Sequence, residues 1–251
     1  MTAPPGLQVS GLRKRFGGVT AVDDASLTIA SGELHALIGP NGAGKTTFIQ
    51  LVSGAERADA GRIVLDGIAI GGVPTHRRVT LGLARSFQIS SIFPAFTVLE
   101  NVALAIQARR PARCAIWRPV VAQAALFEDA RQVLDDVGLG ARSDIVAGAL
   151  SHGERRRLEI GLTVATGARL LLLDEPLAGL GPDESTRVIE LLRGFKGRTS
   201  ILLVEHDMDA VFRLADRISV LVYGRVIATG APQEIRAHPD VRRAYLGESA
   251  A

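Results

Sequence analysis

The segment GPNGAGKT, from Gly39 to Thr46, restricts the fold of this chain more than any other stretch. Its spacing, G-x-x-x-x-G-K-[ST], is typical of a loop that wraps a phosphate group with backbone N–H groups. Such a loop is followed directly by a helix, because the N-terminal end of a helix attracts an anion. The apolar run LHALIG precedes the loop, and the helix-like run TTFIQLVSG follows it and can end at Gly54. The sequence therefore predicts a strand, a nucleotide-binding loop and a helix in succession.

The residues of this loop have separate predicted roles. The three glycines Gly39, Gly42 and Gly44 let the backbone wrap closely around a phosphate. Lys45 reaches the β- and γ-phosphates, and the Thr46 hydroxyl can ligate Mg²⁺. Lysine is rare in this arginine-rich chain, so its presence at the motif position is informative. We expect nucleotide contacts along the whole run Gly39, Pro40, Asn41, Gly42, Ala43, Gly44, Lys45, Thr46 and Thr47.

A second candidate site lies at the end of the apolar run LLLLDEP. A buried strand would carry Asp174 at its carboxyl end as a second anchor for Mg²⁺, and Glu175 could polarise the attacking water. A lone Asp-Glu pair at a strand end is common in proteins without this chemistry. Nucleotide kinases, GTPases and RecA-like motors share both elements, but the guanine-reading N-K-x-D motif is missing and no acceptor pocket or lid can be identified.

The rest of the chain divides into three sections. The first reads as short strands, in VSGLRKRFGG, AVDDASLTIASGE and the Asp-Gly hairpin IVLDGIAI. The middle, from about Val98 to Ala147, has little strand signal and a helical pattern in ALFEDARQVLDDVGL, after the loop-like ARRPARCAIWRP. The last alternates the strands RLLLLD, SILLVE and ISVLV with helix-like runs, which indicates a parallel sheet. A strand YGRVIATG and a short C-terminal helix are expected to follow.

Composition argues against several classes of protein. The 29 basic and 26 acidic residues give a net charge of +3, too balanced to indicate a nucleic-acid partner. The consecutive residues Arg155, Arg156 and Arg157 would fan around a helix instead of forming one face. A single cysteine excludes an internal disulfide, and no apolar run approaches the roughly 18 residues that span a bilayer. We expect a chain without a secretory signal that is soluble or held at a membrane by a partner.

Further motifs occur in the order typical of the ATP-binding-cassette (ABC) family, which the whole chain resembles. ARSFQ supplies Gln88 at the position of the Q-loop glutamine, and LSHGE is similar to the signature L-S-G-G-Q. LAGLGP resembles the D-loop, LVEHD supplies His206 like the H-loop histidine, and RKRFGG places Phe16 where the family keeps an aromatic residue. A lone glutamine or phenylalanine is more often surface or core, but five motifs in register make coincidence implausible.

The resemblance implies the fold and the cofactors. It implies an α/β fold with a P-loop NTPase (RecA-like) core, a small antiparallel β subdomain and a helical insertion subdomain. Residues 1–251 would be a single ABC ATP-binding domain, with the helical subdomain at about 90–160 and a C-terminal extension at about 231–251. The implied activity is ATP hydrolysis coupled to transmembrane transport, with ATP and Mg²⁺ as cofactors.

The resemblance also implies roles for site residues. Glu175, His206 and Gln88 would be catalytic, His206 through the γ-phosphate. Gln88 would sense Mg²⁺, so Thr46, Gln88 and Asp174 form the implied metal set. Phe16 would stack on adenine. Two such domains would pair head to tail, so that Ser151 and Gly153 of one meet the γ-phosphate bound at Lys45 of the other.

A closer likeness concerns the transported solute. GLARSFQISSIFPAFTVLENV, VEHDMDAVFRLADRISVLVYGRVIATG and PDVRRAYLGE resemble the branched-chain amino acid importers, in the subunit with a C-terminal extension. The combination of S-H-G-E and L-E-I-G is similar to the urea type, and ERRR to the lipopolysaccharide type. The block FQ…FP.FTVLEN is the longest match and favours the amino acid branch. A urea, amide or lipopolysaccharide transporter, a soluble non-transport ABC ATPase acting on nucleic acid, and a scaffold without turnover are the alternatives.

The implied partners follow from the family. They are transmembrane permease subunits docked near Gln88 and the helical insert, a second homologous or identical ATP-binding subunit, and indirectly a periplasmic or extracellular solute-binding protein. Phe93, Pro94 and Phe96 are either core or part of the permease groove. No nucleic acid is expected. The implied location is the cytoplasmic face of the inner (plasma) membrane, as a peripheral subunit.

The chain departs from the family pattern at four positions. Gly181 stands where the D-loop usually has Asp, and Phe16 has no hydroxyl. Glu154 replaces the signature glutamine and is expected to point outward along its helix. His152 replaces the first signature glycine. A metal needs several converging ligands and no other His or Cys lies nearby in the sequence, so we expect at most a modest pH-dependent attraction for the partner's phosphate.

Overall fold

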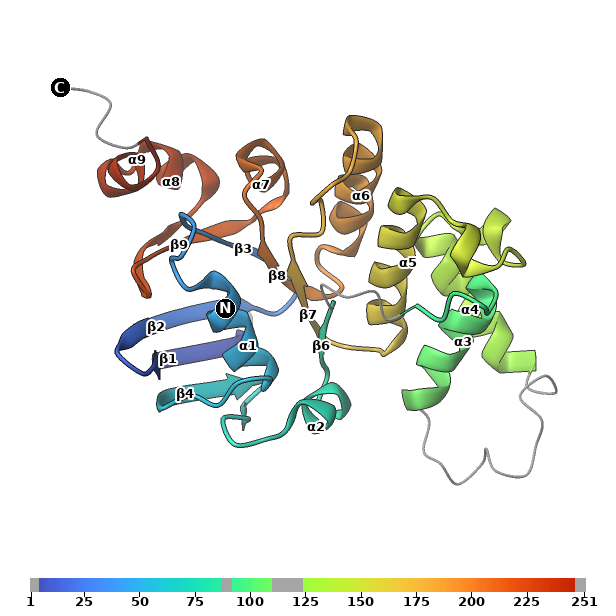
Figure 1. Cartoon of the computed structure of the whole chain (residues 1–251), viewed down its shortest axis with the longest axis horizontal. Coiled ribbons are helices and arrows are strands. Elements are labelled where there is room, and N and C mark those ends of the chain that lie inside the picture. Colours follow the sequence, from blue (N-terminus) through green and yellow to red (C-terminus); the bar gives the residue numbers. More distant parts are fainter. Residues whose placement is uncertain (1–4, 87–91, 110–123, 247–251) are drawn as a thin grey trace.

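The computed structural model describes residues 5–86, 92–109 and 124–246, and two β-sheets form its framework (Figure 1). The larger sheet has six strands in the order β10-β9-β3-β8-β7-β6, and the smaller has four in the order β2-β1-β4-β5. The strands of the larger sheet are β3 (Leu34–Ile38), β6 (Leu83–Arg85), β7 (Leu170–Asp174), β8 (Ser200–Val204), β9 (Arg217–Val222) and β10 (Arg225–Gly230). Strands β6, β7, β8, β3 and β9 run parallel, and β10 pairs antiparallel at one edge. The α/β fold predicted from the sequence is confirmed.

Alternate residues of the central strands face two separate cores. On β7, Leu170 and Leu172 pack in one core with helix α1 (Lys45–Ser53) and the smaller sheet. Leu171 and Leu173 pack in the other core with apolar residues from most of the remaining helices. Successive strand side chains point to opposite faces, so a strand covered on both faces must be apolar throughout. That is why the runs LHALI, LLLLD and SILLV carried a clear strand signal.

The smaller sheet is antiparallel, as the family resemblance implied. Its strands are β1 (Pro5–Phe16), β2 (Val19–Ala30), β4 (Ala60–Leu65) and β5 (Ile68–Ala69). The Asp-Gly hairpin is confirmed between β4 and β5, where Asp66 and Gly67 have φ of 45° and 83°. These positive values belong to the two-residue turn that an Asp-Gly pair favours.

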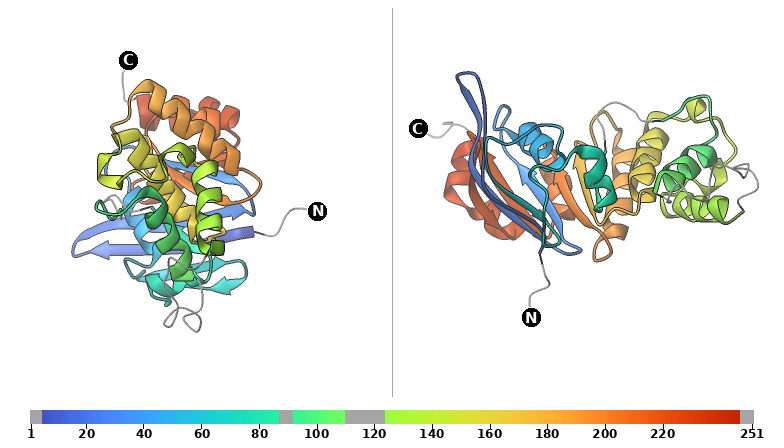
Figure 2. Two further views of the ribbon diagram at one scale, coloured as in Figure 1. Left: turned by 90° about the vertical axis from the view of Figure 1, so that its right-hand side faces the viewer. Right: turned by 90° about the horizontal axis from the view of Figure 1, so that it is seen from below.

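Three helices form a lobe at one end of the molecule, which we call the helical lobe (Figure 2). They are α3 (Val98–Arg109), α4 (Ala124–Asp136) and α5 (His152–Ala165), with short 3-10 turns at Gly140–Arg142 and Ala147–Ala149. The expected helical insertion is therefore present, although its boundaries remain predictions, and most of the loop-like ARRPARCAIWRP lies outside the described residues. In the described part of the chain, every helix is too short or too polar to cross a membrane.

Among the described residues, five further helices lie outside the helical lobe, and two of them, α6 and α7, pack on one face of the larger sheet. They are α2 (Thr75–Thr80), α6 (Pro182–Phe195), α7 (Met208–Leu214), α8 (Pro232–Ala237) and α9 (Pro239–Leu246). Helix α2 and strand β6 were not predicted, because both are too short to show periodicity. The sequence suggested one short C-terminal helix, and the structure has two. Pro239 separates them, since a proline disfavours helical dihedrals at the residue before it, and His238 has ψ of 125°.

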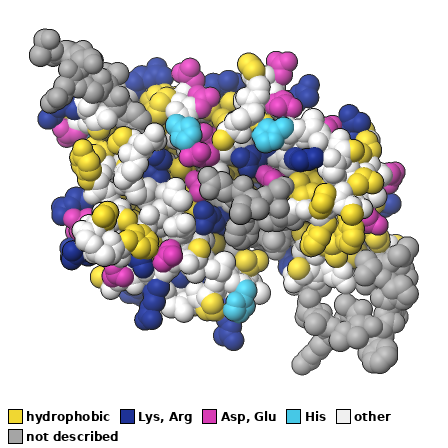
Figure 3. All heavy atoms as spheres, in the orientation of Figure 1, with side chains coloured by type: hydrophobic (Ala, Val, Ile, Leu, Met, Phe, Trp, Pro, Cys, Tyr) yellow, Lys and Arg dark blue, Asp and Glu magenta, His cyan; other side chains and the backbone are white. Residues whose placement is uncertain are grey.

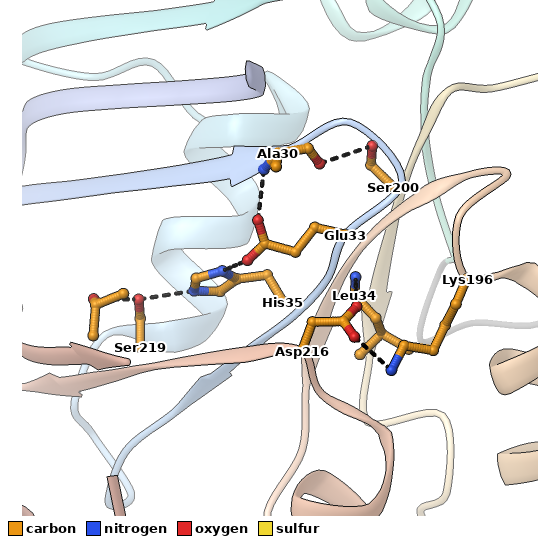
Figure 4. A network of polar contacts seen from close by, with 9 residues as sticks. Ala30, Glu33, Leu34, His35, Lys196, Ser200, Asp216 and Ser219 are labelled. Atoms are coloured by element: carbon orange, nitrogen blue, oxygen red, sulfur yellow. Dashed lines mark hydrogen bonds and ion pairs between the residues drawn. The ribbon is translucent and has the colours of Figure 1, made fainter. Parts of the chain in front are cut away.

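A buried polar network ties β3 to β9 and β10 (Figure 4). The Nδ1 of fully buried His35 donates to Glu33 Oε1 at 2.7 Å, and its Nε2 lies 2.8 Å from Ser219 Oγ. Ser219 Oγ lies 2.7 Å from Thr229 Oγ1. The Ser-His-Glu order resembles that of a hydrolytic triad, but an imidazole without solvent exposure cannot meet a substrate. The network instead satisfies polar groups inside the sheet that carries the phosphate loop.

Arg78 of α2 caps the C-terminal end of α1. Its side chain is buried, and Nη1 donates to the carbonyls of Leu51 and Val52 at 2.8 and 2.6 Å. A cation at this end complements the helix dipole. A side chain at Gly54 would put Cβ 2.6 Å from Arg78 Nε, so the glycine that ends α1 also makes room for its cap.

We predict that Arg78→Met lowers the free energy of unfolding by about 3 kcal/mol, because buried carbonyls lose a charged donor. Urea unfolding followed by circular dichroism measures this change. The exposed neighbour Arg77 provides the control, and Arg77→Met should change stability by less than about 0.5 kcal/mol. Equal effects of the two substitutions would contradict the capping role.

Candidate functional site

Three glycines let the phosphate loop fit between β2 and β9. A side chain at Gly39 would collide with the backbone carbonyl of Leu221, and one at Gly44 with the carbonyl of Ala21. Gly42 and Gly44 have φ of 77° and 102°, which side-chain-bearing residues rarely adopt. The predicted glycines are therefore required by the protein's own backbone, before any ligand is considered.

Backbone hydrogen bonds hold the loop in this position. The N–H of Gly224, in the turn between β9 and β10, donates to the carbonyl of Ala43 at 2.9 Å. The N–H of Asp23 on β2 donates to the carbonyl of Gly224, also at 2.9 Å. The turn thus connects the loop to the smaller sheet. Helix α1 starts directly after the loop, as predicted, so its free N–H groups face the space that the loop encloses.

Lys45 is folded inside the loop that it follows. Its side chain is buried, and Nζ donates to the carbonyls of Gly39 and Pro40 at 2.7 and 3.1 Å. Burial lowers the pKa of the ammonium, while the nearby carboxylates of Glu175 and Asp174 act in the opposite direction. The structure therefore places the loop lysine near both predicted acidic residues.

The carboxyl end of β7 carries Asp174 and Glu175, as the sequence predicted. Asp174 is buried and accepts a hydrogen bond from Arg85 Nη2 at 3.2 Å. Glu175 has φ of 51°, a strained value for a residue with a side chain. Its N–H donates to Val204 of β8 at 2.8 Å, and its carbonyl accepts from Arg156 Nη2 at 3.0 Å. These two bonds hold the strained backbone that aims the Glu175 carboxylate.

His206 lies beside Glu175, because β8 and β7 are neighbours in the sheet. His206 Nε2 is 3.3 Å from Glu175 Oε2, and the two side chains are 55% and 29% exposed. The pair thus lies at the surface, where it can meet a ligand. Lys45, Asp174, Glu175 and His206 gather at the carboxyl ends of parallel strands, where open α/β sheets bind ligands.

Glu205 supports this pair, and the sequence pattern did not single it out. It is buried, and its carboxylate accepts the N–H groups of Leu177 at 2.7 Å and His206 at 3.2 Å. Burial raises the pKa of Glu205. Its signal in the sequence is an acidic residue directly after a fully apolar strand, which needs buried donors.

The other predicted nucleotide contacts lie around the loop. Asn41 and Thr46 are exposed, and Pro40 and Thr47 are half-buried. Phe16 ends β1, is 46% exposed, and has the Lys14 ammonium 5.0 Å from its ring centroid. Gln88 lies outside the described residues.

The signature segment forms the N-terminus of α5. Ser151 caps the helix: its Oγ accepts the N–H of Glu154 at 3.2 Å, and its own N–H donates to Glu154 Oε2 at 2.9 Å. Glu154 also pairs with Arg142 at 2.8 Å. The expectation that Glu154 points outward was therefore wrong, because the acid closes a capping box on the helix end.

Gly153 and His152 have separate neighbours at this helix end. A side chain at Gly153 would collide with the Glu184 carboxylate of α6. The His152 imidazole faces Gly179, where an added Cβ would lie 3.4 Å from Nε2. Ser151 and Gly153 line a cavity of about 180 Å³ that includes no residue of the phosphate loop, so one chain does not bring the two predicted phosphate contacts together.

The three consecutive arginines of α5 point to three different places, as predicted. Arg155 donates to the carbonyl of Gly148, Arg156 to that of Glu175, and Arg157 to that of Gly138. They do not form a basic face, so they give no support to nucleic-acid binding.

The donor set at the β7 end fits Mg²⁺. The carboxylate of Asp174 at the end of β7 and the hydroxyl of Thr46 in the first turn of α1 are hard oxygen ligands of the kind that this ion prefers. No cluster of three His, Cys, Asp or Glu side chains that could hold a metal occurs within residues 5–86, 92–109 and 124–246. A site with few protein ligands is typical of Mg²⁺ held jointly with nucleotide phosphates.

Comparison with known proteins identifies the family. The ABC transporter family model matches residues 22–178. The chain belongs to the ABC transporter family. It is an ATP-binding cassette, and hydrolysis of ATP is its activity. A second model, described as branched-chain amino acid ATP-binding cassette transporter, matches residues 225–251.

Individual relatives cover this cassette almost completely. It is 38% identical over 254 residues to the high-affinity branched-chain amino acid transport ATP-binding protein LivG of Salmonella typhimurium, covering 98% of this chain and 99% of the relative. It is 37% identical over 252 residues to the corresponding protein BraF of Pseudomonas aeruginosa, with the same coverage. A crystal structure of the ADP conformation of an ABC transporter cassette matches with a TM-score of 0.85 at 28% identity, covering 98% of this chain and 100% of that one.

We predict that Glu154→Gln weakens the capping box in a pH-dependent way. The hydrogen bond from the Ser151 backbone, opposed by burial and aided by Arg142, lowers the pKa of Glu154 below its ordinary value of 4.5. The carboxylate therefore contributes stability above pH 4.5 that is lost as pH falls through the lowered pKa. Urea unfolding should find the variant less stable by under about 1 kcal/mol at neutral pH, with the difference vanishing in acid.

The exposed Glu128 of α4 provides the matched control for this experiment, because its side chain is 81% exposed. The substitution Glu128→Gln should give nearly the same small difference at both pH values. A pH-independent difference for Glu154→Gln would show that its carboxylate does not act through its charge.

Proposed function

We propose that this cassette powers the import of branched-chain amino acids. The observation that supports the substrate is the C-terminal match at residues 225–251, which includes helices α8 and α9. The relatives LivG and BraF carry branched-chain amino acid transport in their names and cover the same length. The cassette would act at the cytoplasmic face of the inner membrane, as a peripheral subunit.

The residues at the strand ends have separate roles in the binding and hydrolysis of ATP. The phosphate loop and Lys45 bind the β- and γ-phosphates, and Phe16 stacks on the adenine. Thr46, Asp174 and Gln88 hold Mg²⁺, which supplies positive charge against the phosphates.

The Glu175–His206 pair carries out the proposed chemistry. Glu175 orients and polarises the attacking water, because its strained backbone directs the carboxylate into the site at the carboxyl ends of the strands. His206 contacts the γ-phosphate and restrains Glu175 through the 3.3 Å contact.

A second cassette completes the proposed site. In a head-to-tail pair, Ser151 and Gly153 of one chain meet the γ-phosphate bound at Lys45 of the other. Helix α5 has 14 residues, and its capped N-terminus presents N–H groups and a positive dipole end to that phosphate. ATP then joins the two cassettes, and hydrolysis lets them separate. The second subunit is homologous or identical.

Permease subunits are the proposed membrane partners. An apolar groove of about 330 Å³ lies between the core and the helical lobe, and Phe93 is part of its lining. Phe93 and Phe96 are 56% and 42% exposed and stack at 5.5 Å, so they belong to the surface. Figure 3 shows hydrophobic side chains gathered on this lobe. A solute-binding protein outside the membrane would act through the permease, and no nucleic acid takes part.

We predict that Glu175→Gln reduces phosphate release by about 10²-fold or more, because the variant cannot accept a proton from water. Binding of a fluorescent ATP analogue should persist, whereas Lys45→Ala should abolish it. Glu190→Gln on the exposed face of α6 is the control and should hydrolyse ATP normally. Brisk turnover by Glu175→Gln would remove Glu175 from its proposed role.

We also predict that the double substitution Phe93→Ser and Phe96→Ser weakens co-purification with the permease while leaving ATP hydrolysis by the isolated cassette unchanged. Uptake of labelled leucine by vesicles that contain the complete transporter tests the solute. Uptake of urea instead, extraction of lipopolysaccharide, or recovery of the cassette with RNA alone would each contradict the proposed function.

A further inference from the structure

Two charged side chains reach the lining of the apolar groove. Among its described lining residues, Arg85 from β6 and Glu159 from α5 carry charge, and the others are apolar or uncharged. Arg85 contacts Asp174 directly, and Glu159 is connected to Glu175 through Arg156. Asp174 and Glu175 lie at the carboxyl end of β7, with the proposed catalytic groups. The groove and the catalytic centre are thus linked through polar groups.

The first link is the ion pair between Arg85 and Asp174. Arg85 is the last residue of β6, which pairs with β7, and its Nη2 lies 3.2 Å from Asp174 Oδ2. The two side chains are 11% and 3% exposed, so solvent screens their attraction weakly. Arg85 Nε is buried without a hydrogen-bond partner in the described part of the chain. Among the described residues, no acceptor meets this Nε–H group, and solvent does not reach it.

The second link runs through Arg156. Its Nη1 donates to Glu159 Oε2 at 3.0 Å, and its Nη2 donates to the carbonyl of Glu175 at the same distance. It supports the strained residue Glu175 from the groove side. Both acidic residues at the end of β7 are therefore held by arginines that lie between them and the groove.

We propose that Arg85 is a positioning residue that competes with Mg²⁺ for Asp174, and that the occupant of the groove controls this competition. The proposal rests on the proposed function, in which Asp174 holds Mg²⁺ and a permease segment fills the groove. A carboxylate paired with a guanidinium attracts a second cation less strongly. An occupant that is apolar and carries one carboxylate would draw the guanidinium toward itself. Asp174 is then free for Mg²⁺, so docking favours the metal-bound site.

The first experiment measures how nucleotide binding by the isolated cassette depends on Mg²⁺. The midpoint is the Mg²⁺ concentration that gives half-maximal binding of a non-hydrolysable ATP analogue. Arg85→Gln should lower this concentration about threefold, because the guanidinium no longer competes with Mg²⁺ for Asp174. The same substitution should lower the melting temperature without Mg²⁺, because it leaves a buried carboxylate unpaired. This deficit should shrink when Mg²⁺ and the analogue are present. Arg85→Lys, which keeps the charge, should restore most of the wild-type midpoint.

The matched control is Arg169→Gln. Arg169 directly precedes β7 and pairs with Asp66 at 3.1 Å, away from the catalytic end of the strand. It should leave the Mg²⁺ midpoint unchanged and lower the melting temperature equally in both conditions. An unchanged or raised midpoint in Arg85→Gln, or an equal deficit in both conditions, would overturn the competition. A wild-type chain that bound no nucleotide would instead refute the proposed function.

The second experiment tests control by the groove. In the wild type, the Mg²⁺ midpoint should be lower in the assembled transporter than in the isolated cassette, because the permease segment withdraws Arg85 from Asp174. In Arg85→Gln the two midpoints should coincide. The same shift in both proteins would show that the groove does not act through Arg85, even if the permease binds normally.

Discussion

The structure depends first on the close approach of the phosphate loop to the strands on either side of it. The loop passes against the carbonyls of Ala21 on β2 and Leu221 on β9, where only glycine fits at positions 39 and 44. The loop is thereby held between the smaller sheet and the larger sheet, and α1 follows it directly in the chain. A preorganised anion site costs little rearrangement when the nucleotide binds. The packing of the two sheets therefore fixes the conformation of the binding loop.

The strand order brings the proposed catalytic residues next to this loop. Strands β3, β8 and β7 are parallel neighbours in the sheet. The phosphate loop, His206 and the Asp174–Glu175 pair therefore all follow the carboxyl ends of these strands. The sheet alone does not aim these groups. Glu175 has a left-handed backbone, and Glu205 and Arg156 supply the hydrogen bonds that hold the surrounding segments. Strain at such a position persists only when its neighbours hold it in place.

The signature segment shows how a family pattern can vary without losing its physical basis. Ser151 and Glu154 cap each other, which leaves the helix end ordered although the usual glutamine is an acid. Gly153 lies close to the Glu184 carboxylate of α6, so a side chain at position 153 would have to displace that flexible group. His152 lies between Ser151 and Gly153, and its imidazole faces Gly179 of the segment LAGLGP.

The sequence by itself determined the phosphate loop, the buried parallel strands and the residues at their ends. Loop spacing and fully apolar strands are local properties that packing cannot change. Only the tertiary structure decided which groups support them. The short elements α2 and β6 have no periodicity, yet they supply the Arg78 cap and the Arg85 ion pair. Those contacts join residues far apart in the chain, as do Glu205 with Leu177 and Arg156 with Glu175. A buried charge reveals its partner only when folding has brought the two together.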